Sequence, residues 1–149
     1  MAIDTLEQMQ AIVDRSPFNR WIGVKVAHLG PDGLMLEVPW RLDLVSSPER
    51  NSIHGGVLAS LIDTAGDYAI AARLGYPVPT IDLSVDYHRA ASSGILRASA
   101  QVVHMGKQLI TAQTRIADDQ GRPIASGRGL YFDSGPPRAV AKTTGAGQQ

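Results

Sequence analysis

The 149-residue chain contains no cysteine, which excludes disulfide bonds and thiolate chemistry. Aromatic residues are scarce, with two Phe, two Trp and four Tyr, and no basic stripe with interleaved aromatic residues is present. Neither sign of charge is in excess, because 14 Lys and Arg balance 14 Asp and Glu. A protein that binds a polyanion usually carries a net basic surface. We therefore expect no nucleic-acid partner.

The chain also lacks a long uninterrupted hydrophobic run. Its longest apolar stretch contains Asp63, Asp67 and Arg73, so it does not read as a membrane span. The first ten residues include acids. They lack the basic segment followed by an apolar run that is typical of a signal peptide. We predict a cytoplasmic protein with no membrane association.

Motifs for metals and common cofactors are missing as well. The four histidines fall on separate predicted elements without the spacing of metal ligands. No GxSxG nucleophile elbow and no phosphate-binding GxxxxGK[ST] loop occurs. The sequence therefore predicts neither a metal nor a cofactor. It also argues against a hydrolase with a Ser-His-Asp triad.

What the sequence does contain is one unusual helix after the segment His54-Gly55-Gly56. At 100° per residue, apolar side chains cover almost its whole circumference, which predicts a largely buried helix. The remaining narrow polar strip consists of Ser60, Asp63, Thr64 and Asp67. A carboxylate on a buried helix must be paired, hydrogen-bonded or functional. The alternative is that the strip is only the solvated side of a core helix.

The two glycines at the start of this helix suggest a ligand site. Without side chains, Gly55 and Gly56 let a ligand approach the backbone and leave N–H groups free to donate. The helix dipole adds about half a positive charge at this end. An oxyanion would be stabilised there, and a carboxylate follows about two turns later. This combination is typical of acyl chemistry.

The order of predicted elements is a short helix, two strands, the long helix and four strands. Period-2 alternation is clearest in residues 80–88, where it places Thr80 on the same face as Asp82 and Ser84. This order predicts an α+β fold in which a curved antiparallel sheet wraps around one central helix. The predicted helices cover residues 5–14 and 55–74, and the predicted strands cover 22–28, 33–40, 80–88, 95–104, 108–117 and 122–132.

We predict one domain over residues 1–132 and a disordered tail over residues 133–149, which are polar and rich in Gly and Pro. A sheet covered by a single helix leaves its edges and one face exposed. A second copy of the chain would cover them, so we expect a homodimer or a larger homo-oligomer.

The element order and the segment HGGVLASLIDTA resemble the hotdog-fold thioesterases, in particular the phenylacetate-pathway type of the 4-hydroxybenzoyl-CoA thioesterase superfamily. The resemblance covers about residues 17–132. It implies hydrolysis of acyl-CoA thioesters in a cleft between two subunits, usually in a homotetramer built as a dimer of dimers.

By position, the resemblance implies four catalytic residues. Asp63 matches the carboxylate that acts as nucleophile or as general base. Gly55 matches the glycine whose N–H polarises the thioester carbonyl, and His54 helps to position the thioester. Thr80 falls where relatives have a Ser or Thr that assists the attacking water.

Further positions are implied to bind substrate. Arg89 and Lys107 lie where relatives contact the CoA phosphates, and Gly56 opens the helix beside Gly55. Relatives often have Asn six residues and Gly three residues before the histidine, where this chain has Pro48 and Asn51. Asn51 tolerates a positive φ, so it keeps the turn and offers an amide to the substrate.

Two alternatives remain open from the sequence. Asp67 is the alternative to Asp63 as the catalytic carboxylate. Otherwise Asp67 forms a salt bridge to Arg97 or Arg115. The functional alternatives are a hotdog hydratase or dehydratase, and a non-catalytic acyl-CoA-binding protein.

Overall fold

The computed structural model describes residues 2–137. Its central element is α3 (Gly55–Leu74), which begins after the N-cap His54 and ends at Gly75, a residue with φ +89°. Such left-handed backbone favours glycine, so Gly75 serves as the C-cap of the helix. Nine residues of α3 are buried, which confirms the prediction of a core helix: Leu58, Leu61, Ile62, Ala65, Gly66, Tyr68, Ala69, Ile70 and Ala71.

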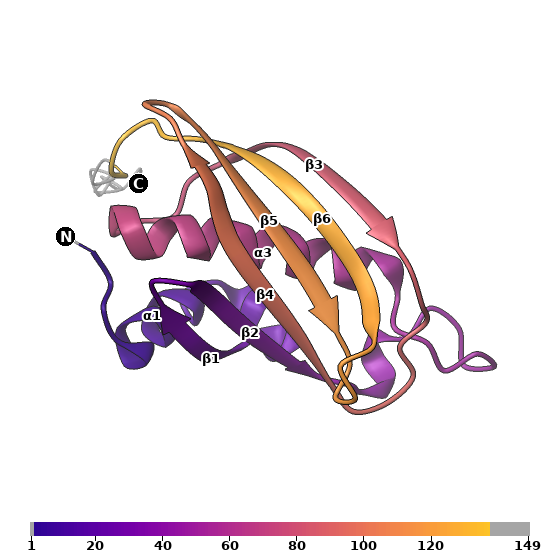
Figure 1. Cartoon of the computed structure of the whole chain (residues 1–149). Coiled ribbons are helices and arrows are strands. Elements are labelled where there is room, and N and C mark those ends of the chain that lie inside the picture. Colours follow the sequence, from indigo (N-terminus) through magenta and orange to yellow (C-terminus); the bar gives the residue numbers. More distant parts are fainter. Residues whose placement is uncertain (1, 138–149) are drawn as a thin grey trace, which may run out of the picture.

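A six-stranded antiparallel sheet curves around α3 (Figure 1). Its spatial order is β1-β2-β4-β5-β6-β3, so β1 and β3 are the edge strands. The strands are β1 (Lys25–Gly30), β2 (Gly33–Pro39), β3 (Thr80–Tyr87), β4 (Ile95–Met105), β5 (Leu109–Ala117) and β6 (Pro123–Phe132). This architecture confirms the predicted α+β class with one long central helix.

Alternating side chains explain which face of the sheet meets α3. On β2, Leu34, Leu36 and Val38 are buried, and on β4, Leu96 and Ala98 are buried. The residues between them face the other side, where Arg97 donates a 2.8 Å hydrogen bond to the Glu37 carboxylate. Burial of the apolar inner face against α3 supplies the hydrophobic stabilisation of the domain.

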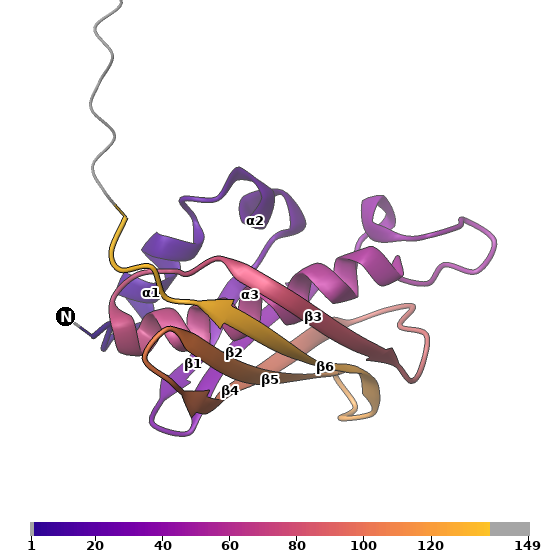
Figure 2. The same ribbon diagram turned by 90° about the horizontal axis from the view of Figure 1, so that it is seen from above.

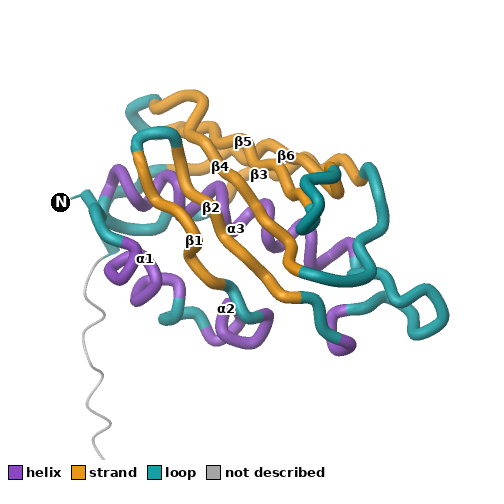
Figure 3. The backbone as a smooth tube through the Cα atoms, turned by 60° about the horizontal axis from the view of Figure 1, so that its bottom comes forward, coloured by secondary structure: helices purple, strands orange, loops and turns teal. Residues whose placement is uncertain are grey.

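Two short helices lie beside α3 on the side away from the central strands (Figures 2 and 3). α1 (Leu6–Val13) agrees with the predicted first helix. No element is predicted between the helix over residues 5–14 and the strand over residues 22–28, where the structure has α2 (Pro17–Ile22). Ser16 instead caps α2, and Pro17 occupies its first turn, where a missing N–H costs nothing. The first strand accordingly begins at Lys25 rather than at residue 22.

The described chain ends in an extended segment that contacts the sheet. The Asp133 N–H donates to Gln108, and the Asp133 carboxylate accepts a 3.0 Å bond from the Tyr76 hydroxyl. Asp133 belongs to the predicted tail, most of which (138–149) lies outside the described residues. Among the helices that the model describes, none is long and apolar enough to cross a membrane.

Candidate functional site

The first turn of α3 has one backbone N–H that remains available to a ligand. His54 closes the helix end: its N–H donates to Leu44, and its Nδ1 accepts from the Gly56 N–H at 2.8 Å. The Val57 N–H donates to the His54 carbonyl at 2.9 Å. In the part of the chain that the model describes, Gly55 N–H makes no hydrogen bond. Gly55 is therefore the donor that can bind an oxyanion at the positive end of the helix dipole.

Tyr87, at the end of β3, fixes the position of Gly55. Its hydroxyl donates to the Gly55 carbonyl at 3.0 Å, and a Cβ added at Gly55 would lie 3.3 Å from the Tyr87 ring. A surface groove begins at this contact and passes His88 and Arg89. Arg89 is thus close to the helix start, as the resemblance implies for a phosphate contact. Sequence reasoning missed Tyr87, although it lies one residue before the basic pair His88-Arg89.

Asp63 and Thr80 meet on the inner side of the sheet. The Thr80 hydroxyl donates to Asp63 Oδ1 at 2.7 Å, so the model brings together two of the four predicted catalytic residues. A β-bulge between Thr80 and Asp82 makes this contact possible. Because of the extra residue Ile81, Thr80 lies on the face opposite to Asp82, and the predicted uniform alternation of this strand is wrong at its start.

The neighbouring carboxylate, Asp67, has a structural contact. Its Oδ1 accepts a 2.7 Å bond from the Val78 N–H, which ties α3 to the segment before β3. The alternative salt bridge is wrong, since Arg97 pairs with Glu37 and, among the described residues, Asp67 forms no ion pair with Arg115. Burial raises the pKa of Asp67 to about 7, against the effect of the Val78 hydrogen bond, and the nearby Asp63 charge adds to the rise.

A second groove contains the whole polar strip of α3. It is lined by Ser16, Phe18, Asn19, Ser60, Asp63, Thr64, Asp67 and Tyr68. Sequence reasoning missed the α2 residues in this groove. An N-cap Ser followed by Pro is a helix-start signal and could have identified them.

Within one chain, the two halves of the predicted site are separated. Gly55 and Asp63 are two turns apart on one helix, about 12 Å along its axis at 1.5 Å per residue. A thioester carbonyl cannot contact both, because hydrogen-bonded and reacting atoms lie about 3–3.5 Å apart.

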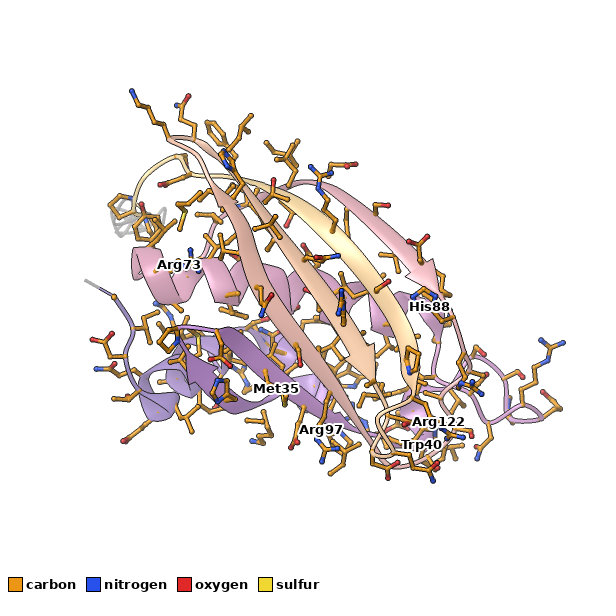
Figure 4. The ribbon with its side chains drawn as sticks, in the orientation of Figure 1. Met35, Trp40, Arg73, His88, Arg97 and Arg122 are labelled. Carbon is orange, nitrogen blue, oxygen red and sulfur yellow. The ribbon has the colours of Figure 1, made fainter. Side chains whose placement is uncertain are left out.

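Arg89 and Lys107 are also far apart within one chain. Arg89 follows β3 at the end of the sheet where Figure 4 labels His88. Lys107 lies in the hairpin between β4 and β5, next to the paired residues Met105 and Ile110. Ile110 pairs with Tyr131, and Tyr131 pairs with Thr80, so Lys107 lies at the end of the sheet where β3 begins. One chain therefore does not bring both cations to one phosphate group.

The loop before α3 contains Asn51, the only non-glycine residue with positive φ among the described residues. Its φ of +56° agrees with the prediction that Asn51 keeps the turn. The Asn51 carbonyl accepts a 3.2 Å bond from the Trp40 indole, and its N–H donates to Ser47 at 3.0 Å. These contacts hold the loop that leads into His54.

Known proteins of one family are similar to this chain over most of the described fold. The family model described as "Thioesterase superfamily" matches residues 51–125. An X-ray structure of a thioesterase-superfamily protein has a TM-score of 0.83 and 54% identity, covering 85% of this chain and 96% of that chain. A Halobacterium salinarum protein that carries a provisional esterase name is 34% identical over 141 residues, which are 87% of this chain and 93% of its own. The proofreading thioesterase EntH of Cronobacter turicensis is 32% identical over 109 residues, 72% and 78% of the two chains. These matches confirm the predicted hotdog fold.

Proposed function

The chain belongs to the thioesterase superfamily and hydrolyses thioesters, and we propose that its substrates are acyl-CoA thioesters cleaved at a site shared by two subunits. Each site combines the Gly55 N–H of one subunit with the Asp63 carboxylate of the other. The observation that carries this proposal is the pair of contacts at the two ends of β3: Thr80 with Asp63, and Tyr87 with Gly55.

A two-fold axis at the middle of β3 would join these two ends. β3 is an edge strand of the sheet, and its Ile81 and Tyr87 are 55% and 56% exposed. Antiparallel pairing of two such edges sets Thr80 of one subunit opposite Tyr87 of the partner subunit. Since Thr80 binds Asp63 and Tyr87 binds Gly55, the carboxylate then approaches the free N–H of the partner subunit's helix.

In this arrangement, the Gly55 N–H donates to the thioester oxygen as negative charge develops on it. One such donor is typically worth about 10²–10³ in rate. Asp63 acts as nucleophile, or as the general base that deprotonates water. A C–O bond forms from water or from Asp63, the C–S bond breaks, and the CoA thiolate leaves and takes up a proton. If Asp63 is the nucleophile, water then adds to the acyl–aspartyl anhydride, breaks its C–O bond and restores the carboxylate. The products are the free acid and CoA.

The groove at Gly55 supports CoA as the leaving group. His88 and Arg89 lie along it, and a guanidinium binds phosphate oxygens in paired hydrogen bonds. The cationic groove begins at the oxyanion donor, so the pantetheine arm would run from the sulfur toward these residues. In a two-fold dimer, Lys107 of one subunit lies at the β3 end that meets the partner's Arg89, which offers a second cation.

Mixing two inactive variants tests the shared site. Gly55→Pro removes the N–H at a helix position that accepts Pro, with a Cβ that would lie 3.3 Å from the Tyr87 ring, and Asp63→Asn removes the carboxylate. Each variant alone should lose at least about 10²-fold in kcat on acyl-CoA, followed by release of free thiol. After denaturation and co-refolding, heterodimers contain one intact site, and the mixture should recover about a quarter of the wild-type activity.

Refolded single variants, treated in the same way, serve as controls. Recovery confined to the mixture supports a shared site. A mixture as inactive as its parents would place both groups of a site in one chain. A wild-type protein that releases no thiol from any acyl-CoA would contradict the choice of substrate.

A further inference from the structure

We propose that the groove between α2 and α3 receives the acyl group of the substrate, with Phe18 as its wall, and that it selects uncharged acyl groups over those ending in a carboxylate. This inference rests on the proposed function, because it takes Asp63 to be the group that acts at the thioester carbonyl.

The charges of the two grooves decide the orientation of the substrate. The groove at Asp63 contains Asp63 and Asp67 and no cation among its lining residues. The groove at Gly55 contains His88 and Arg89 and no carboxylate. CoA carries several phosphate charges, so it is repelled from the first groove and attracted to the second. The thioester carbonyl lies between the grooves, which leaves the groove at Asp63 for the acyl group.

Phe18 offers the acyl group an aromatic surface. Its side chain is 47% exposed although it lines the groove. Its ring lies 6.2 Å from the Trp21 ring, tilted by 31°, and the Arg41 guanidinium lies 5.2 Å from the Trp21 ring centroid. These contacts hold the aromatic pair in place before a ligand binds, which reduces the entropy lost on binding.

α2 itself is fixed on α3, although it has only six residues. The buried Asn19 amide donates to the Tyr68 hydroxyl at 3.1 Å and to the Val13 carbonyl at 3.2 Å. Ser16 caps the start of α2, and Gly23, with φ +80°, ends it. Arg41 donates to the Trp21 carbonyl. The wall of the groove is thus rigidly placed relative to Asp63.

The carboxylates give the groove a sign preference. An acyl chain with a terminal carboxylate would bring a third negative charge close to Asp63 and Asp67. Bringing a further like charge next to these two carboxylates costs free energy, up to several kcal/mol where a bound substrate excludes water. An uncharged acyl group meets only the Phe18 ring and the hydroxyl groups of the strip.

The first test compares two esters that differ only in the terminal group of the acyl chain. Hexanoyl-CoA and adipoyl-CoA have acyl chains of the same length, and the second ends in a carboxylate. At pH 8 the wild-type protein should prefer hexanoyl-CoA on the order of 10²-fold in kcat/KM. Asp67→Asn removes one of the repelling charges and should reduce this preference about tenfold. Equal rates for the two esters, or a preference unaffected by Asp67→Asn, would overturn the charge selection.

The second test separates the Phe18 contact from a general defect. Phe18→Ala should lower kcat/KM roughly tenfold for hexanoyl-CoA and phenylacetyl-CoA but less than twofold for acetyl-CoA, which is too short to reach the ring. The matched control is Leu42→Ala, which removes an exposed apolar side chain (63%) outside the groove and should change none of the three. An equal loss with all three esters would overturn the acyl wall.

A second copy of the chain could occupy this surface instead of the acyl group, and a measurement of the oligomeric mass distinguishes the two. Light scattering should give Phe18→Ala the wild-type oligomeric mass. A smaller mass would assign Phe18 to a subunit contact and overturn the acyl wall. If the wild-type protein hydrolyses no acyl-CoA at all, the proposed function fails; if it does so without the Phe18 or charge effects, only this inference fails.

Discussion

The Thr80 hydroxyl donates a 2.7 Å hydrogen bond to Asp63 Oδ1, across the gap between the edge strand β3 and the central helix α3. Thr80 contributes to the inner face because the bulge at Ile81 turns it away from Asp82. The contact therefore depends on a local irregularity of the strand. It fixes one oxygen of Asp63 and leaves the other for a substrate or a water molecule.

If Asp63 acts at the thioester, Asp63→Asn should lower kcat for acyl-CoA by at least about 10²-fold, because Asn is neither a base nor a carboxylate nucleophile. Asp67→Asn is the matched variant one turn away, and it should keep hexanoyl-CoA turnover within about threefold, since an amide oxygen still accepts from Val78. Thiol release measured for both variants checks this. Full activity in Asp63→Asn with loss in Asp67→Asn would reverse the assignment.

The Thr80 hydroxyl should matter for turnover rather than for stability, because Thr80 is exposed and its bond goes to a charged group. We expect Thr80→Val to lower kcat at least about tenfold with a small change in KM, whereas Thr80→Ser should keep most of the activity. Equal losses in the Ser and Val variants would show that the hydroxyl alone does not account for the effect.

The long helix and the sheet could be predicted from the sequence because their signals are local and repeated. The apolar circumference of α3 predicts burial at every turn, and the period-2 strands predict the antiparallel sheet. Asn51 was predicted to hold a turn from its own tolerance of positive φ, and its φ is +56°. Each of these predictions depends on residues close together in the chain.

The details that the sequence did not give depend on distant contacts. The bulge that turns Thr80 inward depends on how β3 pairs with β6, since Thr80 lies opposite Tyr131 while Asp82 lies opposite Leu130. α2 is only six residues long, and its position is set by the Asn19 contact with Tyr68, 49 residues away. Short helices have little intrinsic stability, so tertiary contacts decide whether they form.

The pKa of Asp67 predicts a pH-dependent stability. Burial raises this pKa from 3.8 to about 7 in the folded protein, so the folded state binds a proton that the unfolded state releases at lower pH. The contribution of Asp67 to the free energy of unfolding is most favourable below about pH 4. It falls as the pH rises toward about 7 and is constant above that pH. Asp67→Asn avoids this loss, and its stability relative to the wild type should increase by a few kcal/mol between pH 5 and pH 8.

Urea unfolding of both proteins at pH 5 and pH 8 measures this difference. Asp82→Asn, at an exposed carboxylate on β3, serves as the control and should follow the wild type at both pH values. A difference between Asp67→Asn and the wild type that is the same at both pH values would contradict a raised pKa.

Gly66 and Tyr131 pack so closely that a methyl group cannot be placed between them. A Cβ at Gly66 would overlap the Tyr131 hydroxyl and lie 3.0 Å from Cζ of a ring that is 0% exposed. The same hydroxyl donates to the Asp63 carbonyl at 3.1 Å. Although Ala favours a helix over Gly by about 1 kcal/mol, Gly66→Ala should destabilise the protein by about 1–3 kcal/mol because the buried ring must move.

Removing the hydroxyl in Gly66→Ala/Tyr131→Phe relieves the overlap, so the double variant should be more stable than the sum of the single changes predicts, by at least about 1 kcal/mol. Additive changes in the free energy of unfolding would show that the helix accommodates the methyl group without moving Tyr131.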